Sequence, residues 1–303
     1  MRVVLSFALV ALFTVGTCAG AVLPVVLMHG LMSSAEGMSH IEAWLQSDFP
    51  GVYVKNVEIG NGKMDSLFMK MDDQVANFAA QLQADDRLAN GFVMIGHSQG
   101  GLITRAYMER YNQPTVHHYV SLAGPQGGVY GVPDFNDWCP DAECPWIAAI
   151  MSKVAESGWL EPLMQNFITF AQYWRDPLNY DMYLNSSGFL ADVNNERNTK
   201  NHTYRRNLVS STGQIHLVEA GDDHIVVPKR SAHFEFFAVG QDTVILNLTQ
   251  TPGFLGDWIG LKTLLTQGRL HLHTVPCSHQ NLPRSSCKAV VYDAIIKPLM
   301  STP

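Results

Sequence analysis

The sequence predicts an α/β fold with a mostly parallel central sheet, helices on both faces and a largely helical insertion. Between Leu23 and Ala123, short apolar runs alternate with segments of helical periodicity. This alternation favours a parallel sheet covered by helices. The rhythm stops at Pro125 and resumes after Gly213, which indicates one α/β core with an insertion of roughly 90 residues.

Seven elements are expected before the interruption. Strands are indicated by short apolar or β-branched runs that end at glycine or polar residues. Helices are indicated by apolar positions three or four residues apart, which give one buried face. The expected strands are Leu23–His29, Val52–Ile59, Phe92–Ile95 and His117–Ala123, and the expected helices are Glu36–Leu45, Met71–Leu82 and Gln99–Tyr111.

The second half of the chain has a different composition. The interrupted stretch holds four of the six tryptophans, namely Trp138, Trp146, Trp159 and Trp174. Bulky aromatic side chains suit either a ligand pocket or the core of a small irregular subdomain. Strand-like runs then return at Gln214–Ala220, Thr243–Leu248 and Arg269–Val275, and Ser286–Leu299 is expected to form a closing helix.

The overall composition is that of a globular protein. Hydrophobic residues make up 47% of the 303 residues and charged residues 16%, so a sizeable core is expected. The formal net charge is −7 and no Lys/Arg cluster is present. This balance argues against nucleic acid as a partner.

The N-terminus has the pattern of a secretory signal peptide. Met1-Arg2 precedes an apolar run, Val3–Val15, and small residues follow. We expect residues 1–20 to be a signal peptide cleaved near Ala19 or Gly20. A membrane anchor is the weaker alternative because the run is short for a span. No later segment has an apolar run long enough to cross a membrane, so we expect a lysosomal or secreted protein.

Four of the five cysteines remain after the predicted cleavage, an even number that suits an oxidising compartment. Three pairings are possible, and proximity in sequence favours Cys139 with Cys144 and Cys277 with Cys287. N-glycosylation acceptor triplets are consistent with secretion, although such triplets also arise by chance. They begin at Asn185, Asn201 and Asn247.

A turn that follows the run Phe92–Ile95 carries the main chemical prediction. Its sequence, Gly96-His-Ser-Gln-Gly100, places Ser98 between an apolar run and a helical pattern. This is the context of the nucleophile elbow of α/β hydrolases, which presents a serine hydroxyl beside the free N–H groups of a helix start. The alternative is a strand-to-helix turn that merely contains a serine.

A nucleophilic serine needs a base and an acid that orients the base, and in α/β hydrolases they follow in the order Ser, Asp, His. Asp222 and Asp223 follow the expected strand Gln214–Ala220, and His279 follows Arg269–Val275. Asp223 is favoured because the hydrophobic residues after it would pack its loop onto the sheet. The sequence thus predicts Ser98 as nucleophile, Asp223 as acid and His279 as base.

Other histidines near the C-terminus offer a competing interpretation. His271 and His273 lie on one face of an expected strand, where a structural role is the simpler expectation. A zinc site from these two residues with His279 and Cys277 is less favoured, because cysteines of a secreted chain are more often in disulfides. We expect no metal and no cofactor.

An acyl-transfer site also needs two N–H donors for the oxyanion. The N–H of Gln99, directly after the serine, is the first candidate. The second should come from the loop after the first strand, where Gly30 permits a tight turn and the Leu31 N–H is the best candidate. His29 is expected to shape this loop without transferring protons.

These residues resemble the palmitoyl-protein thioesterases, a lysosomal family of α/β hydrolases. The resemblance runs from about Pro24 to Leu299. Its specific segments include His29-Gly30 and the serine turn, and further along the chain Gly124–Gly131, Tyr173–Pro177, Phe189–Arg197 and Gly260–Leu264. The resemblance implies the same catalytic residues, Ser98, Asp223 and His279.

The resemblance further implies hydrolysis of long-chain fatty acyl thioesters through an acyl-enzyme. S-palmitoylated proteins or peptides and palmitoyl-CoA are the expected substrates, and an oxygen-ester lipase or a catalytically silent lipid carrier are the alternatives. It implies one hydrolase domain over residues 21–303, in which residues 125–213 form an inserted cap that borders an acyl groove. The oligomeric state cannot be predicted.

Overall fold

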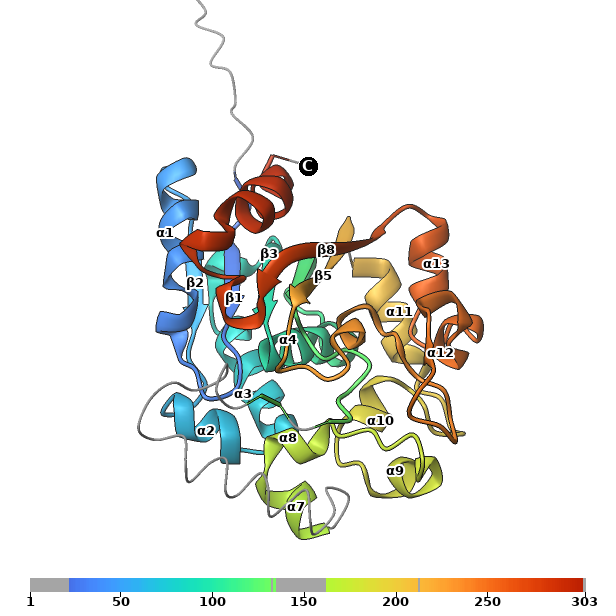
Figure 1. Cartoon of the computed structure of the whole chain (residues 1–303). Coiled ribbons are helices and arrows are strands. Elements are labelled where there is room, and N and C mark those ends of the chain that lie inside the picture. The colour runs from blue at the N-terminus through green and yellow to red at the C-terminus, as the bar shows by residue number, and fades with distance from the viewer. Residues whose placement is uncertain (1–21, 132, 135–161, 212, 302–303) are drawn as a thin grey trace, which may run out of the picture.

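The computed structural model describes residues 22–131, 133–134, 162–211 and 213–301 (Figure 1). The predicted signal peptide, residues 1–20, and the predicted disulfide between Cys139 and Cys144 lie outside the described residues. In the described part of the chain, no helix has the length and apolarity needed to span a membrane.

Six parallel strands form the central sheet, in the order β2-β1-β3-β4-β5-β8. The strands are β1 (Val25–Met28), β2 (Val54–Val57), β3 (Phe92–His97), β4 (Val116–Leu122), β5 (Gln214–Asp222) and β8 (Leu270–Ser278). Each lies within or overlaps an expected strand, and the predicted α/β class with a mostly parallel sheet is confirmed. The chain places β2 on one side of β1 and β3 on the other, so the strand order changes direction between β1 and β3.

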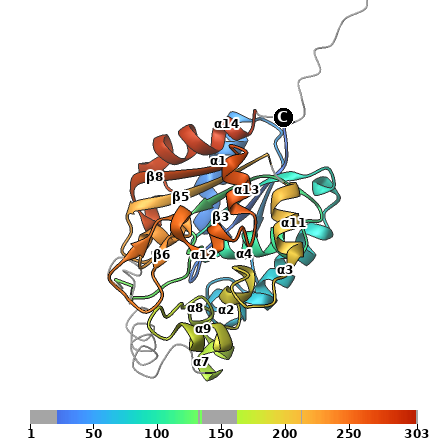
Figure 2. The same cartoon turned by 90° about the vertical axis from the view of Figure 1, so that its right-hand side faces the viewer.

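Helices cover both faces of this sheet (Figure 2). On one face lie α1 (Ser39–Asp48), a C-terminal π-helix (Ala289–Ile296) and α14 (Lys297–Leu299). On the other face lie α3 (Met71–Gln83), α4 (Gln99–Arg110) and α11 (His202–Ser211). The apolar side chains of each layer pack on the buried strands as two hydrophobic clusters, one per face, as the helical periodicity predicts.

The described residues of the predicted insertion contain helices and one isolated bridge, between Val129 and Trp174. Besides α11, which packs on a face of the sheet, the helices are α7 (Pro162–Phe167), α8 (Thr169–Gln172), α9 (Tyr180–Ser186) and α10 (Leu190–Val193). They gather at one end of the sheet, together with α2 (Lys63–Phe68) (Figure 1). Hydrogen bonds from Thr169 to Ser66 and from Tyr173 to Gln99 tie this group to the end where β3 leads into α4.

The expected strand Thr243–Leu248 differs from the structure. Only Ile245–Leu246 is a strand (β7), and it pairs antiparallel with β6 (Phe236–Phe237) outside the main sheet. The β-branched composition of the segment is typical of strands, but its first two residues are exposed and its strand residues are half-buried. A segment without a buried face has little to hold it in a central sheet.

Two short helices, α12 (Pro252–Leu255) and α13 (Leu261–Thr266), connect β7 to β8. The remaining short turns are 3-10 helices at Ala35–Met38, Asp86–Leu88, Lys229–His233, Leu248–Gln250, His279–Asn281 and Ser285–Cys287.

Candidate active site

Ser98 lies in a sharp turn between β3 and α4. It is the residue that precedes the first turn of α4, and its backbone has φ 55° and ψ −129°. A positive φ is uncommon for a residue with a side chain and persists only where surrounding contacts impose it. The Ser98 N–H donates to the carbonyl of Leu122 at 2.8 Å, and its own carbonyl accepts from the Gly101 N–H at 2.8 Å. These bonds fix the turn on both sides of the serine.

Glycines permit the close packing around this turn. A Cβ at Gly96 would lie 2.5 Å from the carbonyl oxygen of Gly100, and a Cβ at Gly100 would lie 2.6 Å from the carbonyl oxygen of Met28. A larger residue at either position would therefore push α4 away from β1 and β3. The two glycines of the motif are required by the approach of strand and helix.

The loop after β1 lies against the same serine. A Cβ on Gly30 would fall 2.7 Å from the Ser98 Cβ and 3.3 Å from its Oγ. This contact arises because β1 and β3 are neighbours at the point where the strand order reverses. In open α/β sheets, the loops at the carboxyl ends of such strands form the ligand crevice.

Asp223 and His279 meet at the carboxyl ends of β5 and β8. The Asp223 Oδ2 lies 2.7 Å from the His279 Nδ1, and both side chains are buried. The other carboxylate oxygen, Oδ1, accepts the N–H groups of Ile225 and Val226 at 2.8 and 2.9 Å. Burial raises the pKa of Asp223, but the imidazole and these N–H donors outweigh it and hold that pKa below its ordinary value. Asp223 is therefore an ionised carboxylate that can orient His279.

The adjacent Asp222 has a different environment. Its side chain is exposed, and its Oδ1 lies 3.2 Å from the Nε2 of the exposed His224. Of the two neighbouring aspartates, the structure brings only Asp223 to His279, in agreement with the preference from the sequence.

His97 connects the serine turn to the histidine loop. This residue ends β3 directly before Ser98, and its Nε2 lies 3.0 Å from the carbonyl oxygen of His279. The two imidazole rings lie 5.0 Å apart. Burial, with a smaller effect from nearby His279, lowers the pKa of His97 to about 3. His97 is therefore a neutral donor to the His279 carbonyl, a role that no motif of the sequence indicates.

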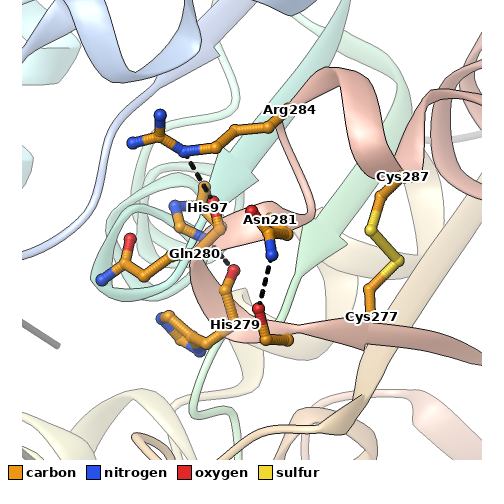
Figure 3. Close-up of a disulfide and its surroundings, with 8 residues drawn as sticks. His97, Cys277, His279, Gln280, Asn281, Arg284 and Cys287 are labelled. Atoms are coloured by element: carbon orange, nitrogen blue, oxygen red, sulfur yellow. Dashed lines mark hydrogen bonds between the residues drawn. A yellow bond between two sulfur atoms is a disulfide. The ribbon is translucent and has the colours of Figure 1, made fainter. Parts of the chain in front are cut away.

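The loop that carries His279 is closed by a disulfide between Cys277 and Cys287 (Figure 3). Within it, the Arg284 Nε donates to the Gln280 carbonyl at 3.1 Å, and the Asn281 side chain donates to the Ser278 hydroxyl at 2.9 Å. The disulfide lies at the base of the loop, and the His279 ring points away from it (Figure 3). The expected disulfide thus limits the movement of the segment that bears the histidine.

The two predicted oxyanion donors lie in neighbouring segments of the chain, one at the start of a helix and one in a loop. Gln99 is the first residue of α4 and Leu31 follows Gly30. Among the residues that the structure describes, neither backbone N–H has a hydrogen-bond acceptor. The Gln99 side chain donates to the carbonyl of Ser66 in α2 at 2.8 Å. His29 is buried between the Gly30 carbonyl and Glu58, with its Nε2 2.9 Å from the Glu58 carboxylate, which fits its expected part in shaping the loop.

The remaining histidines of β8 form a stack of rings with a histidine of β5. His271 and His273 stack on His216 of β5, with ring centroids 4.6 and 5.1 Å from the His216 ring. Over the described residues, no group of three or more His, Cys, Asp or Glu side chains could hold a metal ion. Cys277, the other residue of the zinc alternative, is in the disulfide.

The asparagines of the three glycosylation triplets lie on the surface. Asn185, at the end of α9, is exposed, as are Asn201 before α11 and Asn247 after β7. Their exposure permits glycans without disturbing the core, and their modification stays a prediction.

Comparisons with known proteins agree with this architecture. A family model described as palmitoyl protein thioesterase matches residues 24–279. Palmitoyl-protein thioesterase 3 of Dictyostelium discoideum is 41% identical over 283 residues, which are 93% of each chain. Palmitoyl-protein thioesterase 1 of Caenorhabditis elegans is 33% identical and covers 90% of each chain. The lysosomal thioesterase PPT2 of Rattus norvegicus is 30% identical over 93% of this chain and 89% of its own.

The family match spans β1 through His279, so it includes every strand of the central sheet and each of the predicted catalytic residues. The resemblance inferred from the sequence motifs is confirmed by this match and by the relatives. The chain belongs to the palmitoyl protein thioesterase family and is a hydrolase.

Proposed function

We propose that this protein hydrolyses long-chain fatty acyl thioesters with Ser98 as nucleophile, His279 as base and Asp223 as the acid that orients the base. The observation that carries the proposal is the buried 2.7 Å contact between Asp223 and His279 at the end of the sheet where the Ser98 turn lies. The His97 side chain, one residue before the serine, supports it by holding the His279 carbonyl.

The proposed reaction has two acyl-transfer steps. His279 takes the Ser98 proton while the serine oxygen bonds to the thioester carbon, and the C–S bond then breaks to release the thiol, which takes that proton. Water, deprotonated by His279, attacks the acyl-serine and releases the fatty acid, and Ser98 regains its proton. A thiol has a pKa of about 8.5, so its thiolate leaves far more readily than an alkoxide.

The N–H groups of Leu31 and Gln99 are the proposed donors to the oxyanion of each tetrahedral intermediate. Both lie in segments that flank Ser98, and neither has an acceptor within the described residues. Free donors aimed at a developing charge are the largest single contribution in many acyl-transfer sites.

We propose that residues 125–213 border the acyl chain. Helices α7 to α10 of this stretch support the assignment because they gather at the same end of the sheet as the serine turn (Figure 1). A pocket between this stretch and the segment before α13 is lined by residues including Arg175, Glu196, Phe254 and Trp258, and none of the five proposed catalytic groups lines it.

A lysosomal location is proposed from two observations. The PPT2 relatives of rat and human are named lysosomal thioesterases, and the N-terminal sequence predicts a signal peptide. Expression of the full chain with a C-terminal tag in cultured animal cells, followed by colocalisation with a lysosomal marker, tests it. Recovery of the protein only from the medium would contradict a lysosomal location.

Hydrolysis assays on three matched substrates test the proposed reaction. An S-palmitoyl peptide, palmitoyl-CoA and a palmitoyl oxygen ester are compared for wild type, Ser98→Ala and a surface control, Ser210→Ala. We expect thioester turnover by wild type and Ser210→Ala, and its loss in Ser98→Ala.

The outcomes separate the competing functions. Preference for the oxygen ester would identify an esterase with the same residues and contradict the thioesterase assignment. No Ser98-dependent turnover of any of the three substrates would favour a silent lipid carrier. A ratio of peptide to CoA turnover far from one would identify the preferred class of thioester.

A further inference from the structure

Ser66 is a buried serine of α2 that contacts both loops of the proposed oxyanion site. Its hydroxyl accepts the N–H of Met32 at 2.8 Å and donates to the Lys63 carbonyl at 2.6 Å. Its side chain is only 1% exposed. The Met32 N–H is the peptide directly after Leu31, so the hydroxyl holds the loop one residue beyond a proposed oxyanion donor.

The Ser66 carbonyl holds the other proposed donor. It accepts the side-chain amide of Gln99 at 2.8 Å and the hydroxyl of Thr169, from α8, at 3.0 Å. The Gln99 amide nitrogen also donates to the Gln74 Oε1 at 3.1 Å, and the Gln99 Oε1 accepts the Tyr173 hydroxyl at 3.2 Å. Every polar atom of the Gln99 side chain is thus engaged, which fixes the residue whose backbone N–H begins α4.

Backbone strain explains why the loop needs this support. Met32 has φ 53°, a left-handed conformation that is costly for a residue with a side chain. Strain of this kind persists only where neighbouring contacts impose it. The Ser66 hydroxyl contacts the strained residue directly, and Met32 itself is half-buried. Without that contact, the loop could relax and turn the Leu31 N–H away from Ser98.

We propose that Ser66 is a positioning residue that keeps the two oxyanion donors aligned. Its hydroxyl holds the loop of Leu31 through the hydrogen bond from the Met32 N–H. Its carbonyl holds Gln99 through the hydrogen bond from the Gln99 side-chain amide. The inference rests on the proposed function, because alignment matters only if Leu31 and Gln99 stabilise an oxyanion. It also assigns a role to Tyr173, which belongs to a family-like segment without an obvious hydrolase purpose.

Steady-state kinetics of Ser66→Ala on an S-palmitoyl peptide test the inference. We expect kcat to fall about 10- to 100-fold with KM changed less than about threefold, since a misaligned donor weakens only the transition state. Affinity for a long-chain trifluoromethyl ketone should fall by a similar factor. Its carbonyl carbon bonds to the Ser98 oxygen while the proton passes to His279, which leaves a hemiketal oxyanion. Affinity for an S-hexadecyl thioether peptide, which lacks the acyl carbonyl beside the sulfur, should not change.

Ser231→Ala is the matched control. Ser231 is equally buried, and its hydroxyl accepts the Gly127 N–H at 3.1 Å and donates to the Gly128 carbonyl at 2.5 Å. It makes the same two kinds of bond in a loop without a proposed donor. We expect a comparable loss of thermal stability and an unchanged kcat.

The results distinguish this inference from the proposed function. Unchanged kcat in folded Ser66→Ala, or equal loss of affinity for ketone and thioether, would overturn the positioning role while Ser98-dependent turnover stands. Absence of Ser98-dependent turnover in wild type would overturn both. If Ser66→Ala does not fold, Gln99→Met keeps the backbone N–H and removes the amide contacts. The same selective loss of kcat is then expected, and unchanged kcat would contradict the inference.

Discussion

Strands β5 and β8 carry histidines near both of their ends, and the two groups have different partners. Beyond the carboxyl ends, His279 contacts the buried carboxylate of Asp223 at 2.7 Å. Nearer the amino ends, the His216 Nδ1 lies 2.9 Å from the His273 Nε2, and His271 stacks on the same ring. In the described part of the chain, no carboxylate lies within ion-pair distance of these three imidazoles.

The different partners suit the two groups of histidines to different roles, one to proton transfer and the other to packing. A buried carboxylate fixes one tautomer of an imidazole and stabilises its charged form, as a base in acyl transfer requires. A stack of imidazoles stabilises only neutral forms, because each added proton would repel the next. Burial, followed by the charges of His271 and His273, lowers the pKa of His216 to about 3. The same residue type therefore has two roles on one pair of strands.

The largest difference in activity is expected when one histidine from each group is replaced by glutamine. His279→Gln should lower kcat/KM for the thioester by at least about 10³-fold, because no base remains. His273→Gln should leave kcat/KM within about threefold of wild type and lower the free energy of unfolding by about 1 kcal/mol through loss of one hydrogen bond. Kinetics and urea unfolding of both variants measure the contrast. A large loss of kcat/KM in His273→Gln would mean that the stack takes part in catalysis.

The second prediction concerns the disulfide that closes the His279 loop. The double variant Cys277→Ala/Cys287→Ala should lose about 2–3 kcal/mol of stability, since the bridge closes a ten-residue separation. It should also lower kcat/KM moderately, because His279 lies between the two cysteines and keeps only its Asp223 and His97 contacts. Denaturant unfolding and thioester assays check both effects. Full activity with reduced stability would show that the Asp223 and His97 contacts suffice to position the loop without the disulfide.

Much of this site could be predicted because a parallel sheet collects the ends of its strands at one edge. Val- and Ile-rich runs identified the strands, and the residues directly after them were therefore expected to meet. That reasoning brought Ser98, Asp223 and His279 together from positions up to 181 residues apart. It holds only in part for Thr243–Leu248, where Ile245–Leu246 is a strand but pairs with β6 outside the main sheet and is only half-buried.

The supporting residues could not be predicted from the sequence in the same way. Helix α2 is six residues long, too short for a clear amphipathic pattern, and Ser66 resembles any surface serine. Its partners Met32, Gln99 and Thr169 lie 33 to 103 residues away. Single hydrogen bonds at such separations depend on tertiary packing, and neither periodicity nor motif spacing records them.

The smallest predicted effect is the pH dependence that His216 of the histidine stack gives to the free energy of unfolding. Unfolded His216 has a pKa of about 6.5 and the folded residue one of about 3, so below pH 6.5 the unfolded chain binds one more proton. The stability from neutral burial is present above pH 6.5 and is lost as pH falls toward 3. Between pH 7 and pH 5, this histidine should remove about 2 kcal/mol from the free energy of unfolding.

His216→Phe keeps an aromatic ring in the stack but removes the titrating group. Wild type should therefore lose about 2 kcal/mol more stability than His216→Phe when each is unfolded in urea at pH 7 and again at pH 5. His97, whose pKa is lowered to a similar value, is present in both proteins and cancels in this difference. Equal losses in the two proteins would mean that folded His216 accepts a proton and that the stack tolerates its charge.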